Sequence, residues 1–267
     1  MPGIAIAGRP TGQMGNRLFQ FHFLRQVAVE LDVAYAYPSV PERQIFCDMD
    51  TQPYPVRHVP GKRKRLAPAE VDARDPYTAL LNLREVLSSG RWALLPQSLL
   101  GNHFFDYCFR PPKEVVRLRA PLPAVGPQIG VHLRGGDFRK WDGRAILPAS
   151  YYIDAVEWCL DDAPSARISV FTDDDSLEAA KDVRAHFADR LTLPTSGHPF
   201  ADFRGLASSS HIVSSPSTFA IWAGILSTDS RIVHSKRWVE LKAEEGDFFW
   251  ETVAHGGSRA YVVDFLA

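Results

Sequence analysis

The chain has 267 residues, 45% of them hydrophobic and 23% charged, the balance of a soluble globular protein with one large or two small domains. Its 30 basic and 31 acidic side chains leave a net charge of -1, which argues against a surface built to coat nucleic acid. No apolar run reaches the roughly 18 residues of a membrane span, and the first residues lack a secretory signal pattern. Cys47, Cys108 and Cys159 suggest neither a disulfide framework nor a metal site, so we expect a cytoplasmic protein.

The first elements in the chain predict a strand, a glycine loop and a helix. Residues 3–7 form an apolar run typical of a buried strand, and residues 17–31 repeat apolar side chains at helical spacing. Asn16 stands where a helix N-cap is expected, so the chain opens like a Rossmann-type unit. Seven prolines in residues 38–76 predict irregular loops there. Two shorter helices are predicted further along, at residues 77–89 and 113–118.

The second half of the chain has a regular alternation of strands and helices. Two prolines and a glycine in residues 121–126 predict a boundary between domains 1–125 and 126–267. Alternating strands and helices predict a mostly parallel sheet covered on both faces. The predicted strands are residues 128–133, 167–172, 211–213 and 230–234, and the predicted helices are 149–160, 176–187 and 217–226, the second of them capped by Asp175 or Ser176.

Ligands of such sheets bind at the carboxyl ends of the strands, which brings residues 132–137, 172–175 and 214–219 to one edge. In the first segment, the guanidinium of Arg134 matches phosphate oxygens, and the two glycines after it let backbone amides approach an anion. The alternative is a sharp turn in which Arg134 pairs with Asp137.

The other two segments each have a functional and a structural interpretation. Ser217, at the start of a helix, either helps to bind an anion or serves only as the N-cap. Asp173, Asp174 and Asp175 contain a D-x-D pattern that suits a metal. They also suit a helix N-terminus, and one of them could accept a hydrogen bond from a nucleobase.

Two further features lie in the first half of the chain. The loop at residues 12–16 lacks the full G-x-G-x-x-G spacing, but it brings Gly15 and Asn16 to a helix N-terminus. The basic run at residues 62–65 predicts a solvated loop, or alternatively a weak contact with an anionic membrane surface or a polyanionic acceptor.

Several motifs, in this order along the chain, resemble those of one family. They are G-Q-M-G-N at residues 12–16, an aromatic segment at 101–107, H-L-R-G-G-D at 132–137, Y-Y at 151–152, F-T-D-D at 171–174 and S-P-S-T-F at 215–219. Together they resemble the bacterial α-1,2-fucosyltransferases of glycosyltransferase family 11, which use GDP-fucose. Gly135 departs from the family pattern because a second arginine is usual there; Arg139, Lys140 or Arg144 are candidates to replace it. Ile221 stands at the family's second tryptophan position and is predicted to pack in the core.

The resemblance implies an α/β protein with a GT-B-like fold, that is, two Rossmann-like domains with mostly parallel sheets. The first would be the acceptor-side domain and the second the nucleotide-sugar-binding domain. It implies inverting transfer of fucose from GDP-fucose to a hydroxyl of an oligosaccharide or glycoconjugate acceptor, with α-1,2 linkage to galactose, in bacterial glycan or surface polysaccharide synthesis. No metal, cofactor or nucleic acid is expected. The implied location is cytoplasmic, with or without peripheral contact with the inner membrane.

The resemblance also implies roles for individual residues. Arg134 would contact the β-phosphate, and Asn16 would reach the breaking bond from the other domain. Asp137 is the first choice for the catalytic base; Asp142, His103, Asp106 and the donor phosphate itself are the alternatives. The remaining donor-binding residues implied are Gly15, His132, Gly136, Asp173, Asp174, Ser215, Ser217, Thr218 and Phe219. The competing hypotheses are a transferase of another GDP-sugar and a non-catalytic nucleotide-sugar or glycan-binding relative.

Overall fold

The computed structural model describes residues 6–7, 12–47, 49, 69–70, 76–89, 93–94, 116–123, 126–192, 198–227, 230–246 and 260–263. The chain divides into two units, Met1–Ala120 and Pro121–Ala267. The two units meet after Ala120, whereas the sequence predicts a boundary after residue 125. Each unit has its own mainly parallel sheet with helices, so the mixed α/β class predicted from the sequence is confirmed.

The first unit opens with the predicted strand, loop and helix. Its four-stranded sheet has the order β2-β1-β5-β4, and every pair of neighbours is parallel. The elements are β1 (Ile6–Ala7), α1 (Met14–Glu30), β2 (Tyr35–Ala36), η1 (Pro41–Gln44), β3 (Phe46–Cys47), β4 (Ala69–Glu70), α2 (Pro76–Ser88), β5 (Ala93–Leu94) and β6 (Arg117–Leu118). Strand β6 pairs antiparallel with β3, so the helix predicted over residues 113–118 is wrong at its last two positions.

Helix α1 is buried on more of its surface than its apolar spacing predicts. Leu18, Phe21 and Leu24 are fully buried, as expected, but Gln20 and His22 are fully buried as well. The helix begins at Met14 with Gln13 at its N-cap, and no side chain caps it. The predicted N-cap role of Asn16 is therefore wrong, because Asn16 already lies within the first turn.

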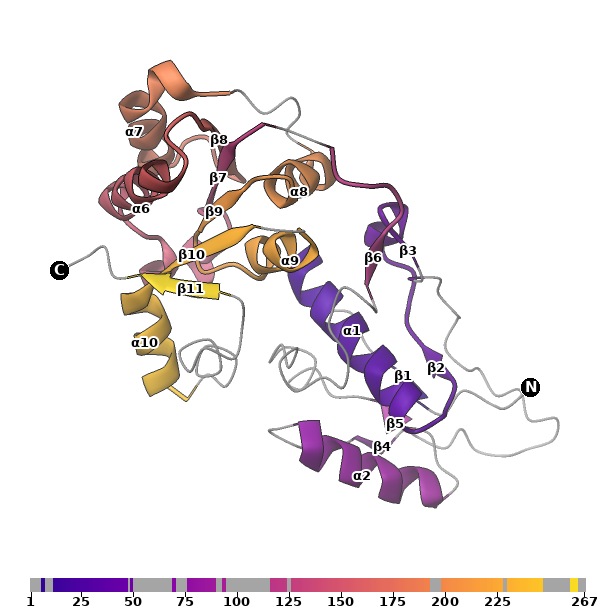
Figure 1. Ribbon diagram of the computed structural model, residues 1–267. Coiled ribbons are helices and arrows are strands. Elements are labelled where there is room, and N and C mark those ends of the chain that lie inside the picture. Colours follow the sequence, from indigo (N-terminus) through magenta and orange to yellow (C-terminus); the bar gives the residue numbers. More distant parts are fainter. Residues whose placement is uncertain are drawn as a thin grey trace. The chain divides into compact units, whose positions relative to one another are not determined.

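The second unit contains a five-stranded parallel sheet in the order β11-β10-β9-β7-β8 (Figure 1). Its strands are β7 (Gln128–Leu133), β8 (Arg167–Thr172), β9 (His211–Ser214), β10 (Arg231–Ser235) and β11 (Ala260–Val263). Its helices are α5 (Phe138–Trp141), η3 (Gly143–Ala145), α6 (Ala149–Asp162), α7 (Glu178–His186), η4 (Ala188–Arg190), α8 (Pro199–Ala207), α9 (Thr218–Leu226) and α10 (Lys236–Glu244).

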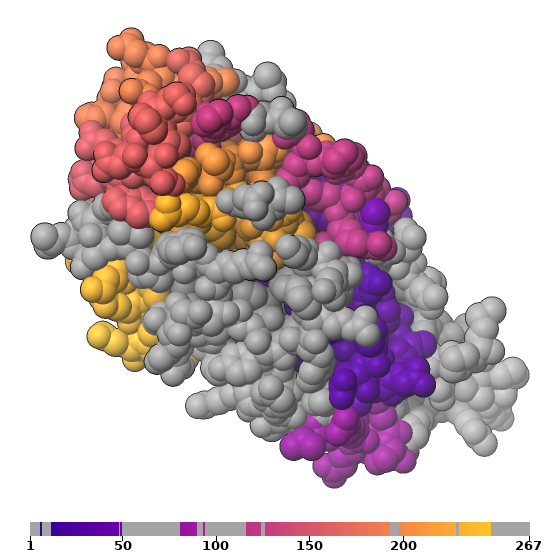
Figure 2. Space-filling model, in the orientation of Figure 1, coloured from indigo at the N-terminus to yellow at the C-terminus, as the bar shows by residue number. Residues whose placement is uncertain are grey.

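Helices cover both faces of this sheet (Figure 1). Helices α6 and α7 pack together on one face, and α8 and α9 pack together on the other. The core between the sheet and α6 includes Val131, Tyr151, Val156 and Ile168, all fully buried. The outward side chains of α6 and α7 form part of the unit's surface, red to orange in Figure 2. Ile221 is also buried, which agrees with its predicted core role.

The strand order shows where the sheet offers a ligand crevice. The chain enters at β7, adds β8 on one side, and then returns across β7 to add β9, β10 and β11 on the other side. The order reverses between β7 and β9, and in open α/β sheets ligands bind outside the carboxyl ends of the strands at such a point. None of the helices in the described ranges combines the length and the apolar character needed to cross a lipid bilayer.

Candidate functional site

The strand register brings the three predicted segments to one level of the sheet. His132 of β7 lies opposite Phe171 of β8 on one side and opposite Ser214 of β9 on the other. The segments that follow these three residues therefore leave the sheet at the same edge. This confirms that residues 132–137, 172–175 and 214–219 lie together, as the predicted parallel sheet requires.

His132 forms the junction between β7 and β9. Its carbonyl accepts a hydrogen bond from the Ser215 amide at 2.9 Å, and its Nδ1 lies 3.2 Å from the Ser215 hydroxyl. The Phe219 ring stacks on the imidazole with centroids 5.2 Å apart, and Phe203 of α8 packs edge-on against Phe219. Burial lowers the pKa of His132 to about 3, so the ring is neutral at physiological pH. His132 is a fixed, uncharged part of the crevice.

The start of α9 is built as a helix N-terminus with its cap in place. The Ser217 hydroxyl accepts a hydrogen bond from the Phe219 amide at 3.3 Å, which confirms Ser217 as the N-cap. The Tyr151 hydroxyl of α6 lies 3.1 Å from the Ser214 carbonyl and 3.2 Å from the Val233 carbonyl, so it tethers the end of β9 and the middle of β10 to this helix. The helix dipole and the first amides of α9 favour an anion at this end.

Arg134 lies at the carboxyl end of β7 between two carboxylates. Its Nη2 donates to Asp137 Oδ1 at 2.8 Å, and its Nη1 lies 3.1 Å from Asp173 Oδ2. The guanidinium carbon is 5.6 Å from the centre of the Phe138 ring, and the side chain is 17% exposed. The predicted pairing of Arg134 with Asp137 is thus present, and it leaves the arginine partly open to solvent.

The two glycines after Arg134 present their amides to a single carboxylate. Gly135 N donates to Asp173 Oδ1 at 2.9 Å, and Gly136 N donates to the same atom at 3.4 Å. A Cβ on Gly136 would lie 3.0 Å from Asp173 Oδ2, so a larger residue there would push this carboxylate away from the two amides. Arg134 and the amides of Gly135 and Gly136 are hereafter called the anion cradle.

The three consecutive aspartates have three different sets of partners. Asp173 binds the anion cradle, Asp174 binds Ser176 and Arg139, and Asp175 pairs with Arg184 at 2.9 Å. Hydrogen bonds from Ser176 hold the pKa of Asp174 below its usual range. The described part of the chain contains no group of three or more His, Cys, Asp or Glu side chains suited to a metal ion.

The predicted cap of the helix after these aspartates is wrong. Helix α7 begins at Glu178, and its N-cap position is Leu177, which has no capping side chain. Asp174 instead accepts from the Ser176 amide at 2.9 Å and closes the turn before the helix. Asp175 is 84% exposed and directed to Arg184.

Arg139 and Gly135 both lie beside the same oxygen of Asp174. A Cβ on Gly135 would lie 3.2 Å from Asp174 Oδ2, and the Arg139 guanidinium pairs with that same oxygen at 2.8 Å. Arg144, the second candidate for the missing arginine, is bound elsewhere, and Lys140 is exposed. Of the three candidates, Arg139 is the one that contacts the aspartates of the site.

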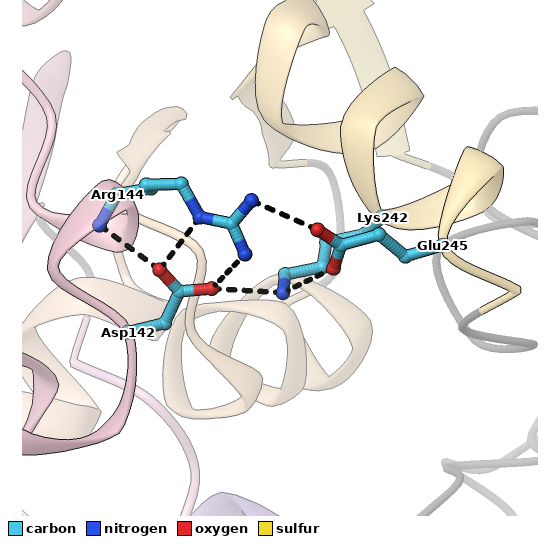
Figure 3. A network of polar contacts seen from close by, with 4 residues as sticks. All are labelled: Asp142, Arg144, Lys242 and Glu245. Carbon is cyan, nitrogen blue, oxygen red and sulfur yellow. Dashed lines mark hydrogen bonds and ion pairs between the residues drawn. The ribbon is translucent and has the colours of Figure 1, made fainter.

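Asp142 belongs to a network that ties the loop after α5 to α10 (Figure 3). It accepts from the amide, Nε and Nη2 of Arg144 and from Lys242 Nζ at 2.9 Å. Glu245 closes the network by accepting from Arg144 and Lys242, both at 2.8 Å. Hydrogen bonds from Arg144 hold the pKa of Asp142 well below its usual range, which suits an anchor better than a base.

We expect Lys242→Met to lower the free energy of unfolding by about 2 kcal/mol, because Asp142 and Glu245 each lose one charged hydrogen bond. The Lys242 side chain is only 10% exposed, and its ammonium lies 4.8 Å from the centre of the Trp238 ring. Lys236→Met is the matched control, since its pair with Glu240 is exposed. Urea denaturation measures both; equal effects of the two variants would contradict a stabilising network.

In the first unit, Asn16 is positioned by the loop before α1. Gly12 has a positive φ of 68°, and a side chain there would collide with the Asn16 amide. Arg17 donates to the Gly12 carbonyl at 3.1 Å and to Glu42 at 2.6 Å. Gly15 is buried beside Asn16 in the same turn. Glu42 was not predicted, because this buried acid lies within a proline-rich segment that has no recognisable pattern.

Several predictions fall outside the described residues. The alternative bases His103 and Asp106 lie there, within the aromatic segment at residues 101–107. The basic run at residues 62–65 and Cys108 lie there as well.

Residues 119–244 match the model of glycosyl transferase family 11. The match covers just under half of the chain and includes the three site segments at residues 132–137, 172–175 and 214–219, but it ends before β11. No curated protein matches the chain.

Solved structures share the fold at low sequence identity. The fucosyltransferase NodZ from Bradyrhizobium is 14% identical, with a TM-score of 0.51 over 87% of this chain and 95% of that chain. POFUT1 in complex with GDP is 11% identical, with a TM-score of 0.53 over 87% of this chain and 98% of that one. Apo POFUT1 is 12% identical, with a TM-score of 0.56 over 88% and 98%. The chain therefore has the predicted GT-B-like fold.

Proposed function

We propose that this protein is an inverting fucosyltransferase that moves fucose from GDP-fucose to a hydroxyl of a sugar acceptor, with α-1,2 linkage to galactose. The observation that carries the proposal is the convergence of the anion cradle and the capped N-terminus of α9 at the reversal point of the sheet. Both are suited to phosphate oxygens. The match to glycosyl transferase family 11 and the fold shared with NodZ and POFUT1 support the same assignment.

The leaving group explains why these groups are needed. GDP departs as a multiply charged anion, and donors already in place stabilise that charge in the transition state. In this proposal Arg134 contacts the β-phosphate, while Ser217, Thr218 and Phe219 line the phosphates and the nucleotide. The proposal includes no metal, because Arg134 and the backbone amides can donate hydrogen bonds directly to the phosphate oxygens. The protein works in bacterial glycan or surface polysaccharide synthesis, in the cytoplasm or at the inner membrane.

The proposal also assigns residues to the guanosine and to the acceptor. His132 and one of Asp173 or Asp174 lie near the guanosine, with Ser215 and Gly136 completing the donor site. Gly15 and Asn16 of the first unit are the remaining donor-binding residues of the proposal. The acceptor, an oligosaccharide or glycoconjugate, binds mainly to the first unit.

Asp137 is the proposed base, and Asp137→Asn tests it. Asp137 is 51% exposed and paired with Arg134 at the carboxyl edge of the sheet. We expect the variant to lose about 10²–10⁴-fold in transfer rate, the usual contribution of a general base, while GDP binding is retained. Transfer at the wild-type rate would remove Asp137 from the mechanism and favour a path in which the donor phosphate takes the proton.

Donor competition distinguishes the main alternative, a transferase of another GDP-sugar. Release of free sugar is measured with GDP-fucose and with other GDP-sugars, each alone and in mixture. The proposal predicts that GDP-fucose is turned over and outcompetes the others. Preferential turnover of a different GDP-sugar would overturn the donor assignment, and GDP binding with no turnover of any donor would indicate a non-catalytic relative.

A further inference from the structure

The anion cradle is already occupied by an anion from the protein itself. Asp173 Oδ1 accepts from both amides of the cradle, and Asp173 Oδ2 lies 3.1 Å from Arg134 Nη1. The Asp173 carboxylate thus contacts all three components of the cradle. Oxygens of a bound phosphate would need the same N–H groups, and an N–H group gives its full strength to one acceptor at a time.

The charges at the cradle oppose a second anion. Arg134 contributes one positive charge, while Asp137 and Asp173 each contribute one negative charge within hydrogen-bonding distance of it. An incoming diphosphate would therefore meet a site with a net negative charge, although its geometry suits phosphate. Replacing the Asp173 carboxylate with an amide would weaken its hold on both glycine N–H groups, because a neutral carbonyl oxygen is a poorer acceptor, and would leave Arg134 with a single carboxylate partner.

We propose that Asp173 competes internally with the diphosphate of the nucleotide and thereby sets how tightly the site holds it. The carboxylate holds the cradle in the unliganded protein and leaves the two glycine amides when a diphosphate binds. Its return would help to expel the GDP product. This inference rests on the proposed function, because it takes the cradle to be the diphosphate site.

Asp173→Asn tests the competition, with Asp175→Asn as the matched control. The two substitutions remove the same charge two residues apart, but Asp175 is exposed and contacts Arg184 instead of the cradle. Calorimetry measures the affinity of the wild type and both variants for GDP and for inorganic pyrophosphate. We expect Asp173→Asn to tighten both by roughly tenfold, the scale of one charge-assisted hydrogen bond, and Asp175→Asn to change them less than twofold.

Unchanged or weaker binding by a folded Asp173→Asn variant would overturn the competition while leaving the proposed function intact. Binding by neither the wild type nor the variant would contradict both. A measurement on the wild type keeps the inference testable if the variant does not fold. Pyrophosphate should shift the amide resonances of Gly135 and Gly136, and saturable binding without these shifts would overturn the inference.

Discussion

We expect Arg134→Ala to lower the kcat/KM of GDP-fucose turnover by about 10²–10³-fold, the usual cost of removing one donor that stabilises transition-state charge. Arg134 is the cation of the anion cradle, and it is held in place by Asp137, Asp173 and the Phe138 ring. Its guanidinium is therefore oriented before any ligand arrives. The measurement is steady-state release of fucose, together with calorimetric binding of GDP.

Arg184→Ala is the matched control for Arg134→Ala. Arg184 also pairs with a member of the aspartate triplet, Asp175, but it lies on α7 and does not contact the cradle. We expect this variant to keep wild-type turnover. If Arg134→Ala were folded and as active as Arg184→Ala, the phosphate-binding role of the cradle would be wrong.

The second large effect is expected in the response of stability to acid. Burial lowers the pKa of His132 to about 3 and that of His234 to about 4, from an unfolded value near 6.5. Between these values the unfolded chain binds more protons than the folded chain. The stabilising contribution is therefore complete above pH 6.5 and is lost as the pH falls toward 4. Each imidazole contributes a slope of at most about 1.4 kcal/mol per pH unit.

Urea denaturation between pH 7.5 and 6 measures this slope above the range in which carboxylates titrate, including Asp202, whose pKa burial raises to about 6. We expect the free energy of unfolding to fall with pH in the wild type. His234→Gln should reduce the slope of the unfolding free energy against pH by the contribution of one buried imidazole. His186→Gln is the control, because His186 is exposed, and we expect it to leave the slope unchanged. A flat profile for the wild type would show that the two rings accept protons in the folded protein.

The fold of the second unit could be predicted because its central strands are continuous apolar runs. Strands β7 and β8 have the predicted bounds, 128–133 and 167–172. Strand β9 is one residue longer than predicted, and β10 is shifted by one residue at both ends. A parallel sheet fixes which strand ends meet, so the pattern of strands and helices was enough to place the three segments of the site together. Helix starts were less predictable, since Asn16 and Asp175 suit a cap by residue type but lie elsewhere in the turn.

Many contacts around the site join residues that are far apart in the chain, and no sequence pattern links them. Lys242 and Asp142 are 100 residues apart in the chain, and neither belongs to a motif. Helix α10, which brings Lys242 to Asp142, was not predicted because its charged residues mask its short apolar stripe. The pairing of Arg134 with Asp137 was one of two stated alternatives, but the bond from Gly135 to Asp173 was not predicted.

Binding of GDP and GDP-fucose, measured by calorimetry with and without EDTA and followed by an assay of donor hydrolysis, tests the central claim most directly. The proposed function predicts saturable GDP binding that EDTA does not change, together with slow release of fucose from the donor. Absence of GDP binding to the folded protein would contradict the assignment of the cradle and the α9 N-terminus as a nucleotide-sugar site.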